Sequence, residues 1–118
     1  MQVPLPHDEL TCQVREILDR VGDKWSLAIV NELGGGTRRF TELKRAIHGI
    51  SQRMLTASLR NLERDGLVSR TVYPVVPPRV DYELTGLGHT FLKTAWSLMS
   101  WAIEHAPDIV EARQKYDQ

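Results

Sequence analysis

The sequence predicts a single domain that is mainly α-helical and carries a small β-hairpin. Two observations favour this class. Apolar residues recur at helical spacing in several stretches, and the ends of these stretches carry residues that start or stop helices. Two β-prone stretches, "LVSRTVYPV" and "RVDYELT", are joined by "VPP". With 118 residues, of which 42% are hydrophobic, the chain can bury one modest core.

The first third of the chain predicts two helices. The first is expected to run from about Thr11 to Val21, and Gly22 suits its end. Asp23 can cap the second helix by accepting from the free backbone N–H groups of its first turn. The glycine run at 34–36 ends this helix. Its apolar stripe consists of Trp25, Ala28, Ile29 and Leu33.

The middle of the chain predicts a helix-turn-helix. "TRRFTELKRAI" contains a short extended piece and then a helix, for which we expect Thr41 as the N-cap. "HGI" makes the turn, and Ser51 caps a second helix that ends at Gly66. Residues 42–65 are therefore expected to form a helix, a short turn and a helix, and the β-hairpin follows directly. This order is the winged helix arrangement.

The last helix is expected to start after Thr85, to run from about Gly86 to His105 and to stop at Pro107. It is apolar nearly all round, whereas a surface helix of a monomer needs only one apolar stripe. The second stripe predicts a symmetric dimer; the alternative is a helix sunk into the core of a single chain. The expected interface residues are Phe91, Leu92, Ala95, Trp96, Leu98, Met99 and Trp101.

Charge is segregated along the chain, although the net charge is zero. Between residues 37 and 79 there are nine Lys or Arg and three Asp or Glu, and acidic residues outnumber basic ones on both sides. A basic middle is typical of a surface that binds a polyanion. The alternative is a basic face in contact with solvent alone.

The polar side of helix 51–65 predicts contact with double-stranded DNA. In a helix-turn-helix, the N-terminal residues of the second helix reach base edges in the major groove. Arginine pairs with guanine and glutamine with adenine, whereas a helix N-terminus and later arginines suit phosphates. The alternative is an amphipathic helix with a solvated side. The candidates on this helix are Ser51, Gln52, Arg53, Thr56 and Arg60.

Three further arginines are candidates for DNA contact. Arg38 and Arg39 are placed to reach phosphates, or are simply solvated. Arg79 lies in the expected wing, residues 74–80, where it would enter the minor groove or contact the backbone. The alternative for Arg79 is an ion pair with Asp81 or Glu83.

Other classes of function find no support in the sequence. The four histidines and the single cysteine show no metal-ligand spacing, and "GGGT" lacks the lysine of a phosphate loop, so we expect no enzyme, no metal and no cofactor. No apolar run is long enough to span a membrane, and no secretory signal is recognisable. A cytoplasmic location is therefore expected.

The segments "GDKWSLAIVNEL", "RRFTELKRAIHGISQRMLTASLRNLERDGLVSR" and "VPPRVDYELTGLG" closely resemble the HxlR-type winged helix transcriptional regulators. The resemblance runs from about Cys12 to Trp101. It implies a cytoplasmic homodimer that dimerises through its first and last helices and binds operator DNA. Members of the family act as repressors or activators, and we expect a repressor here. The implied organisation is a winged helix-turn-helix with N- and C-terminal dimerisation helices: a core at 23–85 and a dimerisation helix at 86–106. Residues 1–9 lie outside the resemblance, and the prolines at positions 4 and 6 predict a flexible arm there. The alternative function is a winged helix module that binds protein rather than specific DNA.

Cys12 is a candidate sensor of oxidants or electrophiles. It lies at the expected start of the first helix, where free N–H groups and the helix dipole favour a thiolate. The resemblance supports this role, since some members of the family sense such compounds through a cysteine before the first helix. It also implies a small-molecule or oxidant inducer. The alternative is a small structural residue, because cysteine is often buried.

Overall fold

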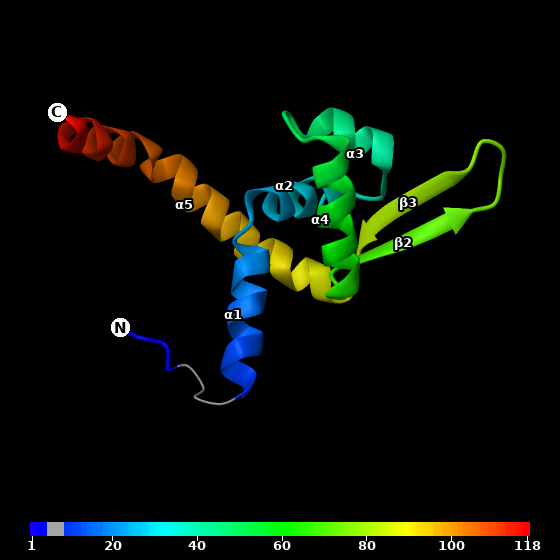
Figure 1. The fold of residues 1–118 in the computed structure, drawn as a ribbon, viewed down its shortest axis with the longest axis horizontal. Coiled ribbons are helices and arrows are strands. Elements are labelled where there is room, and N and C mark those ends of the chain that lie inside the picture. The colour runs from blue at the N-terminus through cyan, green and yellow to red at the C-terminus, as the bar shows by residue number, and fades with distance from the viewer. Residues whose placement is uncertain (5–8) are drawn as a thin grey trace.

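The computed structural model describes residues 1–4 and 9–118 of the chain. Of the predicted arm at 1–9, residues 5–8 lie outside the described residues, residues 1–4 form no helix or strand, and Glu9 already belongs to the first helix. The molecule is elongated, with the β-hairpin at one end and the C-terminal half of the last helix at the other (Figure 1). The elements are α1 (Glu9–Val21), α2 (Lys24–Leu33), β1 (Arg38–Arg39), α3 (Phe40–Ala46), α4 (Gln52–Arg64), β2 (Val68–Tyr73), β3 (Arg79–Leu84) and α5 (Gly86–Asp117).

The predicted fold class is confirmed: the chain is mostly helical, with a small antiparallel sheet in the order β1-β3-β2. The hairpin register pairs Val68 with Leu84 at its base and Tyr73 with Arg79 near its tip. The short extended piece before the helix-turn-helix joins the sheet, because Arg38 pairs with Tyr82. The sheet thereby ties the wing to the start of α3.

The core lies where α2, α4, the base of the hairpin and the start of α5 meet. Leu55, Leu59 and Leu62 lie on one side of α4 and are buried in this core, where they form a leucine stripe along the helix. Burial of each such side chain contributes about 1.5–3 kcal/mol to the stability of the fold. The stripe therefore fixes the rotation of α4 about its axis. Its polar side must then face outward. The other buried apolar residues are Ile29, Val30, Leu33, Leu43, Ile47, Ile50, Leu67, Val68, Leu84, Phe91 and Ala95.

Three predicted helix caps and one predicted turn are confirmed. The side chain of Asp23 accepts a hydrogen bond from the backbone N–H of Ser26 at 3.0 Å. Ser51 Oγ accepts from the N–H of Met54, and Thr85 Oγ1 from that of Gly88, each at 3.0 Å. After α4 the chain turns through Gly66, whose φ of +77° favours glycine.

Two predicted helix boundaries are wrong. α3 begins at Phe40, not after a cap at Thr41, because the backbone N–H of Arg39 donates to Glu42 Oε1 at 2.9 Å and closes the helix start there. α5 does not stop at Pro107 but continues to Asp117. This part of the helix is exposed, so water can solvate the carbonyl that proline leaves without a donor. The residues after Pro107 include good helix formers and a Lys115–Glu111 ion pair of 3.2 Å.

Only the N-terminal half of α5 packs against the core. Phe91 and Ala95 were expected at a dimer interface, but both are buried within the protomer, where α5 packs against α2 and β3. The prediction is therefore wrong for these two residues. Leu92 and Met99 are half-buried against the same core. In the described part of the chain, no helix combines the length and hydropathy needed to cross a membrane.

Candidate nucleic-acid interface

The polar side of α4 forms one continuous exposed surface. Ser51, Gln52, Arg53 and Arg60 are exposed, and Thr56 is half-buried. A shallow open depression of about 550 Å³ lies over this face. The structure therefore brings four of the five predicted helix residues together at one depression. The side chains that line it are Gln52, Arg53, Thr56, Ala57 and Arg60.

The two arginines of this face have no ion-pair partner in the part of the chain that the structure describes. No ion pair among the described residues involves Arg53 or Arg60, whereas Arg20 pairs with Asp65 at 3.2 Å. Figure 1 shows that the N-terminal end of α4 lies at the edge of the molecule away from α5. There the free N–H groups of the first turn and the guanidinium of Arg53 favour an anion, and Arg60 adds a second positive charge two turns further along the helix.

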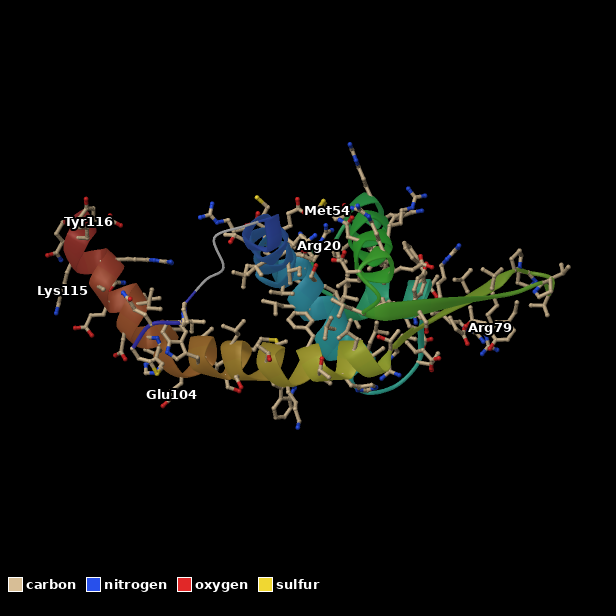
Figure 2. All side chains as sticks on the ribbon, turned by 90° about the horizontal axis from the view of Figure 1, so that it is seen from below. Arg20, Met54, Arg79, Glu104, Lys115 and Tyr116 are labelled. Carbon is tan, nitrogen blue, oxygen red and sulfur yellow. The ribbon has the colours of Figure 1, made fainter. Side chains whose placement is uncertain are left out.

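Met54 extends the surface and was missed by the sequence reasoning. Its side chain is 41% exposed at the same end of α4 (Figure 2). The signal was present, because Met54 falls off the leucine stripe and adjoins Arg53. An exposed thioether there adds an apolar contact to an otherwise polar face, which suits the methyl group of thymine.

Arg38 and Arg39 lie at the base of the wing, apart from the α4 depression. Arg38 is half-buried and donates from Nη1 to the carbonyl oxygen of Thr37 at 3.1 Å. Arg39 is exposed. Both line a hollow of about 370 Å³ that also contains Glu42, Arg79 and Asp81. The two acidic side chains make this hollow less suited to an anion than the surface of α4.

Arg79 is held by the protein itself. Its Nε and Nη2 donate to the two carboxylate oxygens of Asp81, each at 2.9 Å, and the guanidinium lies over the Tyr73 ring at 5.0 Å. The hydrogen bonds, and then the opposite charges, raise the pKa of Arg79 and lower the pKa of Asp81. The ion pair is therefore intact at any pH above the ordinary pKa range of aspartate. It is lost only as the pH falls through the lowered pKa of Asp81. The ion-pair alternative is thus the one that the structure contains.

An exposed apolar surface lies on the other side of the molecule. Figure 1 shows α1 and the C-terminal half of α5 projecting away from the hairpin, and Figure 2 shows Glu104, Lys115 and Tyr116 far from Arg79. Between α5 and the end of α2 lies a hollow of about 640 Å³ bordered by Gly34, Leu92 and Trp96. The large apolar side chains exposed on these two helices are Ile17, Leu18, Leu87, Trp96, Leu98, Trp101, Ile103, Val110 and Tyr116.

Cys12 lies in the first turns of α1, and its side chain is exposed. The interpretation of this cysteine as a buried structural residue is therefore wrong for the protomer. In residues 1–4 and 9–118, no three His, Cys, Asp or Glu side chains gather as metal ligands would. An exposed thiol is open to reagents in solution.

A helix-turn-helix with an exposed basic recognition face, followed by a β-hairpin, defines a winged helix DNA-binding protein. The profile of the HxlR-like helix-turn-helix family matches residues 20–109, and the chain belongs to this family. It is a DNA-binding transcriptional regulator and not an enzyme.

Relatives agree with this assignment over most of the chain. The HTH-type transcriptional regulator YtfH of Escherichia coli is 40% identical over 104 residues, which are 88% of this chain and 82% of the relative. The structure of YtfH from Salmonella typhimurium has a TM-score of 0.82 at 38% identity, covering 91% of this chain and 97% of that one. The redox regulator HypR in its reduced form has a TM-score of 0.75 at 39% identity, covering 85% and 98%.

Proposed function

We propose that the protein is a cytoplasmic homodimer that binds a two-fold symmetric operator and represses transcription by occupying it. The observation that carries this proposal is the outward face of α4. Arg53 and Arg60 line one depression there, on the side of the helix opposite the buried leucine stripe. Each protomer inserts α4 into the major groove, and the wing at 74–80 lies beside it. Repression is favoured because a repressor only has to occupy the operator, whereas an activator needs a second surface that contacts the polymerase.

The side chains on α4 divide into two roles. Gln52, Arg53 and Thr56 lie in its first two turns and meet base edges, where arginine suits guanine and glutamine suits adenine. Ser51 at the helix N-terminus and Arg60, two turns further along, hold phosphates. Arg38 and Arg39 add phosphate contacts at the base of the wing.

Selection of bound sequences from a random duplex library tests the proposal. We expect a palindromic site with half-sites about 10 base pairs apart, bound tightly at low salt and more weakly as salt rises. If the wild type enriches no sequence and a protein partner is recovered from the source cells instead, the chain is a protein-binding winged helix module.

Arg53→Ala and Arg60→Ala should separate base reading from phosphate binding. Arg53→Ala is expected to cost about 1–3 kcal/mol on the selected duplex and to relax the preference at one base position. Arg60→Ala should weaken all duplexes alike and lower the slope of log K against log salt by about one. Fluorescence anisotropy on the selected and a scrambled duplex measures both. Equal, sequence-independent losses for the two variants would contradict this division of roles.

Redox control through Cys12 is a second proposed property. The thiol is exposed on α1, and the chain resembles HypR, whose oxidised form has a TM-score of 0.72 and 41% identity to it. We propose that α1 and α5 form the dimer interface and thereby set the distance between the two α4 helices. Half-sites lie a fixed turn of DNA apart, so a covalent change on α1 that alters this distance weakens binding.

Diamide is expected to lower the operator affinity of the wild type and to leave Cys12→Ser unaffected. It accepts two electrons and two protons from the two Cys12 thiols of a dimer, which leaves a Cys12–Cys12 disulfide. Non-reducing gel electrophoresis detects the linked dimer, and anisotropy measures the affinity. If diamide lowers the affinity of the Cys12→Ser protein to the same degree, Cys12 is not the redox sensor.

A further inference from the structure

A second, smaller cleft continues from the α4 depression towards the hairpin. Its volume is about 220 Å³, and it shares Thr56 and Arg60 with the depression. Glu63 extends the same side of α4, because positions 56, 60 and 63 recur at helical spacing. From the sheet come Arg70 and Tyr82, which are cross-strand partners and so lie on the same sheet face.

The cleft carries a net positive charge and hydroxyl donors. Two guanidinium groups, of Arg60 and Arg70, face the single carboxylate of Glu63. Arg70 Nε lies 3.6 Å from Glu63 Oε2, and both side chains are close to half exposed. Burial raises the pKa of Tyr82, so its phenol remains a protonated donor at neutral pH. One excess positive charge with O–H donors suits a monoanion with several acceptor oxygens.

We propose that this cleft holds a backbone phosphate of the bound DNA, with Arg70 as a phosphate contact and Glu63 as a competing anion that occupies Arg70 in the free protein. The inference rests on the proposed placement of α4 in the major groove. A duplex that covers the depression also reaches the cleft, because the two share a wall. A free phosphate ion offers the same chemistry but no such continuity.

The two charges are expected to act in opposite directions on DNA binding. Arg70→Gln should weaken binding to the selected and the scrambled duplex by roughly tenfold and lower the salt slope by about one, since one phosphate loses its cation. Glu63→Gln should strengthen binding to both duplexes by about three- to tenfold, because the phosphate no longer competes with a carboxylate. In the Arg70→Gln background, Glu63→Gln should change the affinity less than about twofold.

Anisotropy titrations over a salt series on wild type, the two single variants and the double variant test this. Arg113→Gln is the matched control, because it removes one exposed positive charge from the far part of α5. It should change the affinity by less than about twofold and leave the salt slope unchanged. Thermal melts that match the wild type show that the variants are folded.

Four outcomes decide the inference and the proposed function on which it rests. Opposite shifts for Arg70→Gln and Glu63→Gln, coupled in the double variant, support it. A wild type that prefers its selected duplex, together with an Arg70→Gln variant of unchanged affinity and slope, overturns it and leaves the proposed function standing. Saturable binding of inorganic phosphate to the free wild type, lost in Arg70→Gln while the DNA affinity of that variant is unchanged, overturns it in favour of a small-anion site. Failure of the wild type to prefer any duplex removes the proposed function itself.

Discussion

The Trp96→Ala variant is expected to sediment as a monomer and to bind the selected operator at least roughly 100-fold more weakly than the wild type. The Trp96 side chain is 63% exposed beside the hollow between α2 and α5, so the protomer alone does not bury it. Burial of a tryptophan against a partner contributes about 2–3 kcal/mol, and two-fold symmetry makes the same contact twice. A monomer keeps one half-site and loses the second binding event.

Leu92→Ala is the contrasting variant. Leu92 is half-buried against the protomer core, so its truncation should lower the melting temperature of the protomer. Trp96→Ala should instead leave the fold of the protomer intact, as judged by circular dichroism, and change the sedimentation coefficient. A wild type that is monomeric at micromolar concentration, yet binds a palindromic site tightly, would disprove the dimer.

Gly88→Ala is expected to cost about 3 kcal/mol of folding stability, which corresponds to a fall in melting temperature of roughly 10–20 °C. A Cβ at Gly88 would overlap the carbonyl oxygen of Leu67 and approach the Leu84 side chain to 3.2 Å. That carbonyl already accepts from the N–H of Thr85 at 3.1 Å, so it cannot move aside without breaking this bond. The start of α5 would have to shift away from the hairpin base.

Gly86→Ala is the matched control two residues earlier in the same helix. A Cβ at Gly86 meets no atom within 4 Å, and its φ is not positive, so alanine should leave stability unchanged or raise it by up to about 1 kcal/mol. Thermal melts of both variants provide the comparison. Equal melting temperatures for the two would show that α5 does not need its close approach to Leu67.

Local signals predicted most of the fold. The caps at Asp23, Ser51 and Thr85 were predictable because each depends on one side chain and the N–H groups of the next turn. Thr41 failed as a cap because Glu42, one residue further along, bonds back to Arg39 and starts the helix earlier. Pro107 failed as a stop because the helix there is solvated rather than packed, and sequence alone does not reveal which carbonyls water can reach.

The candidate DNA surface was predictable where it depends on a single helix. Buried leucines fix the polar side of α4, so its outward residues follow from spacing alone. The partners of charged side chains depend on the tertiary structure. From the sequence, Arg79 could contact a DNA groove or form an ion pair, and nothing indicated the cleft around Arg70. The same limit applies to α5, where periodicity found both stripes but could not say that Phe91 and Ala95 pack inside the protomer.

The ion pair of Arg79 changes what the wing brings to a complex with DNA. Residues 74–78, which connect β2 to β3, are proline and valine only, and the side chain of Val76 is fully exposed. With Arg79 engaged by Asp81 and Tyr73, the exposed surface of this tip is apolar, and we expect its contact with a groove to release water rather than counterions. We therefore expect the contact of the wing with DNA to weaken less than that of α4 as the ionic strength rises.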